Sequence, residues 1–407
     1  MLFLMKKSYI FILGQNPTLS LAEIHAKFPQ ADLTDASRLA ALFNFNSIEP
    51  LTPESVNYFG GTVKITELIE FIDIKKDNKL FPKLSDYINK ITSLKKFGLS
   101  LYGFSKFDLK QLGIKLKNKH KNRPRFVFNR LSVMSSESVH KNKLLSPDSC
   151  EIIICQLKNQ LVLAKTISCQ NPRLYAKRDD CRPKRDYKLG MIPPRLAQIL
   201  LNLATIKPGD AVLDPFCGLG TILQEGALMG FKMLGLDNNQ PTLIKTKQNL
   251  NYLKDLLIKN LLPFPIPPSW PKIDLADAKA LSGLKTKFNA VVSEGYLGPN
   301  KPKEVQLGPI FENLKKTYWL ALNNFKDILP IGARVVMTWP AIFSKQSREP
   351  KLLPDFDKII NLGYTQVEFI PPNWRNLGFV NLTTRGTIIY HRPEQVVGRE
   401  IISLEKI

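Results

Sequence analysis

Long apolar runs and paired cysteines are both missing from this sequence of 407 residues. No apolar run approaches the roughly 20 residues that a membrane-spanning helix needs, so we expect neither a transmembrane segment nor a membrane partner. The five cysteines form no Cys-x-x-Cys pair and have no histidine beside them, which favours a reduced, cytoplasmic protein without a metal. The apolar start MLFLMKKSYIFIL is split by Lys6 and Lys7 and has no small-residue cleavage site, so we expect no signal peptide.

Acidic residues are scarce relative to basic ones. The chain has 58 lysines and arginines against 35 aspartates and glutamates, for a formal net charge of +23. A field of this sign concentrates polyanions, although solvated surface lysines alone would give the same total. The distribution favours a nucleic-acid partner, because Asp108 is the only acid within one run of basic residues. We predict that this run contacts phosphates through Lys106, Lys110, Lys115, Lys117, Lys119, Lys121, Arg123, Arg125 and Arg130.

Three aromatic residues, Phe107, Phe126 and Phe128, lie within this basic run. Aromatic rings between basic side chains can stack on nucleic-acid bases. The alternative is that they are core residues of strands, and we favour it for Phe126 and Phe128.

The glycine-rich stretch AVLDPFCGLGTILQEGALMG, residues 211–230, lacks two residues that are typical of phosphate-binding and dinucleotide-binding loops. The stretch predicts a buried strand, a tight turn and a helix, as in nucleotide-type pockets. No lysine follows Gly220, which excludes a phosphate-binding P-loop, and Leu223 stands where a dinucleotide site has its third glycine. Cys217 has no basic partner in view, so we interpret it as a small loop residue and not as a nucleophile. An acidic residue with Gly-x-Gly suits a ligand with a cationic amino-acid end and no phosphate, such as S-adenosylmethionine.

The spacing of apolar residues divides the chain into three parts. Residues 1–170 predict an α+β domain, with a strand and a helix at 59–72 and a hairpin of strands at 151–157 and 160–167. Residues 171–204 begin polar, basic and turn-rich, and we interpret them as a connector. Over residues 205–407, strands and helices alternate, which predicts an α/β, Rossmann-like domain with a doubly wound parallel sheet. Its strands are expected at 211–215, 232–237, 273–277, 289–294 and 334–339, with two closing strands at 364–370 and 386–393 as an antiparallel edge.

Aspartates close the first three strands of this predicted sheet, and ligands of such sheets bind at the carboxyl ends of the strands. We expect Asp214 near the ammonium group of the cofactor, Asp237 on its two ribose hydroxyls and Asp277 on its adenine amine. A helix N-cap would explain Asp237 alone but explains the set of three poorly. The predicted cofactor-binding residues are Asp214, Phe216, Gly218, Gly220, Thr221, Asp237, Asn238, Asp277 and Ala278.

The fourth predicted strand ends in SEGYLGP, residues 293–299, and we expect the reaction there. Methylating the exocyclic amine of a base is difficult because the nitrogen lone pair is delocalised into the ring. An enzyme must therefore supply acceptors for the N–H groups and a surface that clamps the base. Glu294 is the predicted acceptor, Tyr296 the predicted stacking surface and Ser293 a third candidate. A packed core aromatic is the alternative for Tyr296, whereas a buried Glu294 without a partner would be costly.

With these motifs in place, the chain resembles the THUMP-domain tRNA guanine-N2-methyltransferases that modify guanosine 10, and the wider UPF0020 group of DNA-methylase-like proteins. The similarity rests on DPFCGLGT, LGLDNN, SEGYLGP and TTRGTIIYHRPEQVVGRE, on RDDCRPKRDYKLGMIPPRLAQILLNLA in the connector, and on LGQNPTLSLAEI, FGGTVKI and FGLSLYG near the start. It implies a class I methyltransferase fold, S-adenosylmethionine as cofactor, tRNA as partner and an N-terminal THUMP-type RNA-binding domain.

One departure from this family concerns the end of strand four, where its members carry Asp or Asn followed by Pro-Pro-Tyr. Aligning the tyrosines puts Ser293 in the acid position, whereas a one-residue gap puts Glu294 there. We favour Glu294, because a carboxylate is the better acceptor, and we expect Gly295 in place of proline to loosen the loop. Two other functions stay open, a DNA amino-methyltransferase, for which no target-recognition domain is evident, and a non-catalytic RNA-binding protein with a relic cofactor site. A small activator subunit is also compatible with the sequence.

Overall fold

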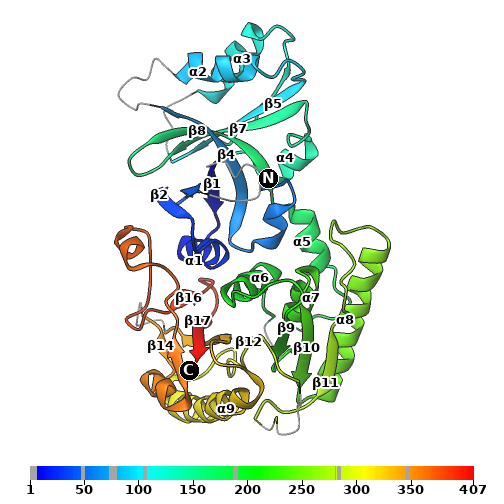
Figure 1. Ribbon diagram of the computed structural model, residues 1–407, viewed down its shortest axis with the longest axis vertical. Helices are drawn as coiled ribbons and strands as arrows, with labels where there is room; N and C mark the ends of the chain where they lie inside the picture. The colour runs from blue at the N-terminus through cyan, green and yellow to red at the C-terminus, as the bar shows by residue number, and fades with distance from the viewer. Residues whose placement is uncertain are drawn as a thin grey trace. The chain divides into compact units, whose positions relative to one another are not determined.

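The computed structural model describes residues 7–46, 51–72, 80–103, 108–186, 191–279, 281, 286–344 and 349–407. Two members of the predicted basic run, Lys106 and Phe107, lie outside these residues. The chain forms two compact units, whose elements are labelled in Figure 1. The first unit comprises residues 1–21, 28–173 and 376–380, and the second comprises residues 22–27, 174–375 and 381–407.

The described strands of the first unit make one eight-stranded sheet in the order β2-β3-β1-β4-β8-β7-β5-β6. They are β1 (Lys7–Leu13), β2 (Asp32–Ser37), β3 (Ala40–Phe45), β4 (Thr62–Ile72), β5 (Lys96–Tyr102), β6 (Arg125–Val127), β7 (Ser149–Gln156) and β8 (Leu161–Cys169). Helices α2 (Leu80–Asn89), α3 (Leu109–Lys119) and α4 (Ser136–Lys141) belong to this unit, and α1 (Pro17–Lys27) is divided between the two units after residue 21. In one apolar core, Leu84 of α2 and Leu116 of α3 cluster with Phe97 of β5 and Ile152 of β7.

Two predictions for the first unit have different outcomes. The hairpin is confirmed, because β7 and β8 pair in antiparallel fashion from Ile152–Lys165 to Gln156–Leu161. The strand followed by a helix at 59–72 is wrong, because the segment forms the single strand β4. The stretch TELIE favours a helix by local propensity, but pairing with β1 on one side and β8 on the other determines the outcome.

The second unit is built on a mixed sheet, whose described strands run in the order β11-β10-β9-β12-β13-β17-β15. They are β9 (Ala211–Asp214), β10 (Lys232–Asp237), β11 (Lys272–Leu275), β12 (Ala290–Glu294), β13 (Arg334–Ile342), β15 (Tyr364–Gln366) and β17 (Val397–Lys406). Two short strands lie off this path, β14 (Lys351–Leu352) beside β13 and β16 (Ile388–Tyr390) beside β17. β9 to β13 pair in parallel, whereas β17 is antiparallel to β13 and to β15. The α/β fold class with a doubly wound sheet is confirmed.

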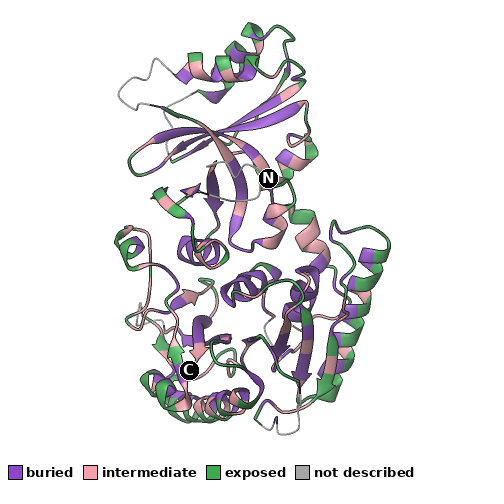
Figure 2. Ribbon diagram, in the orientation of Figure 1, coloured by how far each residue is buried: buried purple, intermediate pink, exposed green. Residues whose placement is uncertain are grey.

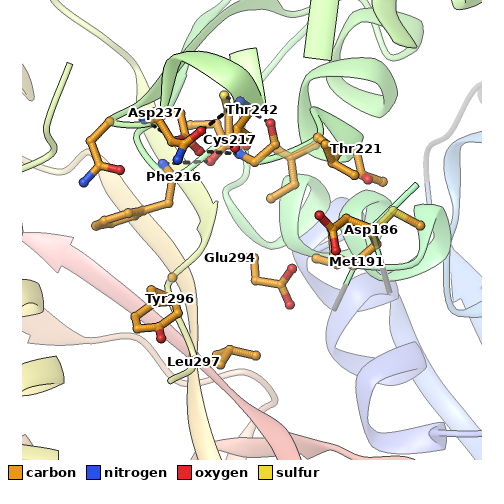
Figure 3. A pocket seen from close by; sticks show the side chains of 18 of the residues that line it. Asp186, Met191, Phe216, Cys217, Thr221, Asp237, Thr242, Glu294, Tyr296 and Leu297 are labelled. Carbon is orange, nitrogen blue, oxygen red and sulfur yellow. Dashed lines mark hydrogen bonds between the residues drawn. The ribbon is translucent and has the colours of Figure 1, made fainter. Parts of the chain in front are cut away.

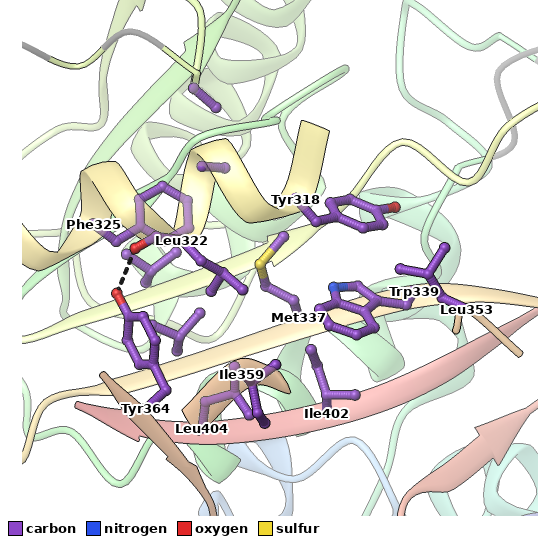
Figure 4. Close-up of a cluster of buried hydrophobic side chains, with 14 of the residues drawn as sticks. Tyr318, Leu322, Phe325, Met337, Trp339, Leu353, Ile359, Tyr364, Ile402 and Leu404 are labelled. Carbon is purple, nitrogen blue, oxygen red and sulfur yellow. Dashed lines mark hydrogen bonds between the residues drawn. The ribbon is translucent and has the colours of Figure 1, made fainter. Parts of the chain in front are cut away.

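Helices α5 (Pro172–Arg178), α6 (Pro194–Leu203), α7 (Thr221–Leu228), α8 (Gln240–Ile258) and α9 (Leu307–Ile328) accompany this sheet. The central strands are buried along almost their whole length (Figure 2). α9 contributes Tyr318 and Phe325 to a core that also holds Trp339 of β13 and Ile402 of β17 (Figure 4). None of the helices in the described part of the chain combines the length and apolar character that crossing a membrane requires.

The closing strands differ from the prediction. β15 and β16 are short pieces of the predicted 364–370 and 386–393, and each pairs with β17. β17 was not predicted, because Arg399, Glu400 and Ser403 interrupt its apolar pattern. In the structure these three side chains are buried, and Glu400 accepts a hydrogen bond from Thr387 at 2.6 Å. A polar residue is tolerated in a central strand when the fold provides its partner.

Candidate active site

The turn between β9 and α7 depends on its two glycines. Gly218 and Gly220 have φ angles of +50° and +82°, a region that glycine enters without steric penalty. The Gly218 amide donates to a carboxylate oxygen of Asp237 at 3.1 Å, and its carbonyl accepts from the Thr246 hydroxyl. β10 and α8 therefore hold the turn from two sides.

Leu223, which stands at the position of the missing third glycine, packs against Gly235 of β10. A Cβ added at Gly235 would lie 2.4 Å from the Leu223 side chain and 3.0 Å from Cys217. The close approach of helix and strand that a dinucleotide site achieves with a glycine in the helix is achieved here with a glycine in the strand. Cys217 is buried, and burial together with the nearby carboxylates raises the pKa of its thiol. Both observations agree with a packing role for this cysteine.

A cavity of about 830 Å³ opens at the carboxyl ends of β9, β10 and β12 (Figure 3). This volume is in the range of sites for cofactors and small ligands. Of the nine predicted cofactor-binding residues, seven line it: Asp214, Phe216, Gly218, Thr221, Asp237, Asn238 and Asp277. The two others lie elsewhere, since Gly220 is the residue before α7 and Ala278 is buried in the core, where its carbonyl accepts from Asn324.

Asp214 is the most deeply buried carboxylate of the pocket. It is 1% exposed, and its Oδ1 accepts a hydrogen bond from the Ser293 hydroxyl at 2.6 Å. Burial raises the pKa of Asp214 to about 7, while the bonds from Ser293 and from the Phe216 amide lower it. A cationic group in the pocket would favour the ionised form.

Asp237 is held by main-chain donors. It accepts from the amides of Gly218 and, at 2.9 Å, Asn239. Burial raises the pKa of Asp237, and these two bonds oppose the rise. The N-cap of α8 is Asn239, which accepts from the Thr242 amide at 3.0 Å. Capping therefore does not account for Asp237.

Two predicted cofactor contacts have other partners in the structure. The Thr221 hydroxyl accepts from Arg182 at 2.6 Å, a bond that attaches the connector to the start of α7. Asp277 accepts from the Lys279 amide at 2.9 Å and forms an ion pair with the Lys279 side chain at 3.3 Å.

At the end of β12, adjacent residues point in different directions. Ser293 is fully buried and bonds to Asp214, so it does not line the cavity. Glu294 does line it, and its carboxylate forms an ion pair with Arg399 of β17. Burial raises the pKa of Glu294, whereas Arg399 and a bond from the Ile192 amide lower it. The two alignments considered above put either Ser293 or Glu294 in the acceptor position. Of these two residues, Glu294 lines the cavity and Ser293 does not.

Tyr296 also lines the cavity and is 55% exposed. Its ring is therefore not a packed core aromatic. Figure 3 shows Tyr296 and Glu294 extending from the segment at the end of β12, with Phe216 and Asp237 at the glycine turn. Together the lining residues place a carboxylate and an accessible aromatic ring on the same cavity as the Asp214 and Asp237 carboxylates.

Comparison with known proteins identifies relatives of this chain. The UPF0020 model, described as an RMKL-like methyltransferase domain, matches residues 182–258. A tRNA (guanine(10)-N2)-dimethyltransferase of Methanocaldococcus jannaschii is 28% identical over 199 residues, which are 44% of this chain and 56% of that protein. The probable tRNA (guanine(10)-N2)-dimethyltransferase of Methanothermococcus thermolithotrophicus is 33% identical over 122 residues, which are 30% of this chain and 70% of the relative.

The chain belongs to this tRNA guanine-N2-methyltransferase family. It spans about half the length of the first relatives that it matches. The crystal structure of TrmN from Thermus thermophilus shares the fold, with a TM-score of 0.50 and 17% identity, over 99% of this chain and 100% of that one. The sheet order described above is thus that of a class I methyltransferase.

Several residues that line the cavity of this family member were not predicted from the sequence. Arg399 was missed together with its strand β17. Asp186 and Met191 lie in a stretch whose polar composition is typical of a linker, yet both line the cavity. Asp186 also forms an ion pair with Lys245 of α8 at 3.5 Å. The signal for Asp186 was the basic and acidic density of RDDCRPKRDYK, which we interpreted as connector composition, and no local signal pointed to Met191.

The predicted RNA contacts lie in the first unit, on α3 and the segment after it. Asp108 precedes α3 and caps it by accepting from the amides of Lys110 and Gln111. Lys117 is half-buried, and the rest of the set is exposed: Lys110, Lys115, Lys119, Lys121, Arg123, Arg125 and Arg130. None of these side chains forms an ion pair with a described carboxylate, and the Nζ of Lys119 lies 5.4 Å from the centre of the Phe81 ring.

The two described phenylalanines of the basic run have different surroundings. Phe126 packs on Phe97 at 5.1 Å and fills the space over Gly113, where a Cβ would lie 2.2 Å from its ring. Phe128 is 45% exposed, so our prediction of a core position is wrong for it. Since β6 ends at Val127, Phe128 follows the strand and has no core to face.

Among the described residues, no group of three or more His, Cys, Asp or Glu side chains is placed to hold a metal ion.

Proposed function

We propose that the chain is an S-adenosylmethionine-dependent methyltransferase that methylates the exocyclic N2 amine of a guanosine in tRNA. The observation that carries the proposal is the presence of Glu294 and Tyr296 on the same cavity as Asp214 and Asp237. The first two residues have the chemistry to hold a base with an amine, and the last two have the chemistry to hold a cofactor with an ammonium group and a ribose. The family supports the choice of guanine N2 and tRNA.

The residues of the cavity fit the cofactor. Asp214 offers a buried carboxyl for the ammonium group, and Asp237 offers oxygens for the ribose hydroxyls next to the glycine turn. The glycine turn has no lysine for a phosphate, in agreement with a ligand that lacks one. When bound, the cofactor supplies a methyl group on a positively charged sulfur.

Glu294 and Tyr296 are proposed to act on the base. The carboxylate of Glu294 accepts hydrogen bonds from the N–H groups of the guanine and favours a pyramidal N2, whose lone pair is then available. After transfer, the same carboxylate can accept the proton that N2 releases. Burial raises the pKa of Glu294, which makes the carboxylate a better proton acceptor. Tyr296 supplies a flat, exposed ring on which a base flipped out of its stack can lie.

The first unit is proposed to hold the tRNA as a THUMP-type domain. Its exposed basic residues on and after α3 are suited to phosphates, and phosphate contacts position an RNA without reading its sequence. A tRNA substrate and free cysteines support a cytoplasmic location for the protein. A small activator subunit remains compatible with this proposal.

The proposal is tested with purified protein, radiolabelled cofactor, tRNA transcripts and duplex DNA, followed by mass spectrometry of the nucleosides. We expect label only on tRNA, as N2-methylguanosine or N2,N2-dimethylguanosine. Glu294→Gln should lower the rate of methyl transfer at least a hundredfold, whereas Glu312→Gln, at an exposed glutamate of α9, should not change this rate. Label on adenine or cytosine of DNA would replace the proposal with a DNA amino-methyltransferase. Cofactor binding without transfer to any RNA would identify a relic site.

A further inference from the structure

The side chain of Arg399 is almost completely buried, yet only one of its nitrogens has a partner among the described residues. It is 6% exposed and lines the cavity from β17. Its Nε donates to Oε1 of Glu294, and its two terminal amino groups make no hydrogen bond within the described residues. Neither of these amino groups is fully enclosed, so both are open to the cavity and can donate to a ligand that carries an acceptor next to Glu294.

We propose that Glu294 and Arg399 together read the Watson–Crick edge of the target guanine. This inference rests on the function proposed above. Guanine presents two donors, N2–H and N1–H, followed by one acceptor, O6, in a row along this edge. Glu294 accepts from N2–H and N1–H, and Arg399 donates a terminal N–H to O6. Arg399 thereby determines specificity for guanine in addition to its ion pair with the acceptor.

The proposed contacts exclude the other amine-bearing bases. Adenine and cytosine present a ring nitrogen acceptor beside their amine, which would face the carboxylate of Glu294 without a proton between them. Adenine also presents a C–H group where Arg399 would donate, whereas cytosine presents its O2 there and is excluded only by the ring nitrogen that faces Glu294. A site built to hydrogen-bond a ligand strongly rejects an analogue that leaves its buried polar groups unpaired.

Replacing one atom of the substrate isolates the Arg399 contact. The tRNA is assembled by ligation with either guanosine or 6-thioguanosine at the mapped target position, and kcat/KM for methyl transfer is measured for both at pH 7. The sulfur analogue keeps N1–H and the N2 amine but accepts hydrogen bonds weakly at position 6. We expect the wild-type protein to disfavour it about tenfold, as for loss of one good base contact. In Arg399→Met this penalty should fall to less than twofold.

Two controls separate specificity from stability. Arg392→Met, at an exposed arginine in the segment before β17, should retain the full sulfur penalty. Arg399→Lys keeps a positive charge beside Glu294 and should show an intermediate penalty. It also carries the test if Arg399→Met does not fold, as judged by circular dichroism and cofactor binding. A sulfur penalty that is unchanged in the Arg399 variants overturns the inference while the proposed function stands. Absence of methyl transfer to any guanosine by the wild type overturns both.

Discussion

The hydroxyl of Tyr318 donates to the main-chain carbonyl of Tyr296 at 2.5 Å. Tyr318 belongs to α9, is fully buried and stacks on Trp339 with ring centroids 5.4 Å apart and an interplanar angle of 5°. Its ring occupies the space beside Gly295, where a Cβ would lie 2.6 Å from a ring carbon. The glycine that we expected to loosen this loop is therefore a packing requirement. The loop at the end of β12 is held by a buried tyrosine.

The first prediction concerns Gly295→Ala. The added methyl group would overlap the Tyr318 ring, which cannot withdraw because it stacks on Trp339. We expect a loss of about 1–3 kcal/mol in the free energy of unfolding, as for overpacking of a core, and a larger proportional loss of kcat than of cofactor affinity. Urea denaturation and methyl-transfer kinetics measure the two effects. Gly308→Ala, at an open position of α9, should change neither. Equal behaviour of the two variants would contradict the packing role of Gly295.

The second prediction concerns Asp237→Ala. This substitution removes the proposed ribose contact and also the acceptor for the Gly218 amide, so the glycine turn loses one of the hydrogen bonds that hold it. We expect the dissociation constant of S-adenosylmethionine to rise at least tenfold, which is ~1.4 kcal/mol of binding free energy. Isothermal titration calorimetry measures it. Asp274→Ala, at an exposed aspartate of β11, is the matched control and should bind the cofactor normally. A rise of less than twofold in Asp237→Ala would remove this residue from the cofactor site.

Local patterns were sufficient to predict the parallel half of the second unit. β9, β10 and β12 are short apolar runs that end in an acidic residue, and the positive φ angles of Gly218 and Gly220 follow from the turn that must join strand to helix. These features depend on residues that are close in the sequence.

The features that were not predicted depend on residues far apart in the chain. Arg399 and Glu294 are separated by 105 positions, and each is an unfavourable strand residue until the other is beside it. Tyr318 explains Gly295 only once α9 has packed on the sheet. The periodicity of the sequence does not show which distant residues pair. Neither β17 nor the contact of Tyr318 with the loop after β12 could therefore be predicted from it.

The third prediction concerns the basic residues of the first unit. Lys115 and Lys121 are both exposed, and neither has an ion-pair partner among the described residues. Replacing both by alanine should weaken tRNA binding and reduce the slope of log K against log salt by about 1–2, since each lysine that neutralises a phosphate contributes nearly one unit. Filter binding at several salt concentrations measures the slope. The control is the double substitution of Lys95, which pairs with Asp148, and Lys158, in the β7–β8 turn. An equal loss of tRNA affinity and of slope in the control variant would mean that the effect reflects only the net charge of the protein.

The last prediction concerns the pH dependence of stability and Asp214. Burial raises the pKa of Asp214 to about 7, whereas an unfolded chain has an aspartate pKa of about 4. Between these values the folded state retains a proton that the unfolded state has released, so this residue makes the free energy of unfolding fall as pH rises from about 4 to 7. Asp214→Asn carries no titrating proton, and its amide oxygen can still accept from the Ser293 hydroxyl. Relative to the wild type, the variant should therefore gain stability between pH 5 and pH 8, by about 1–4 kcal/mol.

Urea denaturation of the cofactor-free protein at pH 5, 6, 7 and 8 measures this difference, and several other buried carboxyl groups cancel because they are common to both proteins. Asp274→Asn, at an exposed position, should give a curve parallel to that of the wild type. If the curve of Asp214→Asn is parallel as well, Asp214 is already ionised in the free protein at pH 5. Its negative charge would then be balanced by the Ser293 hydroxyl and the Phe216 amide alone, and a bound cation would add little to that balance.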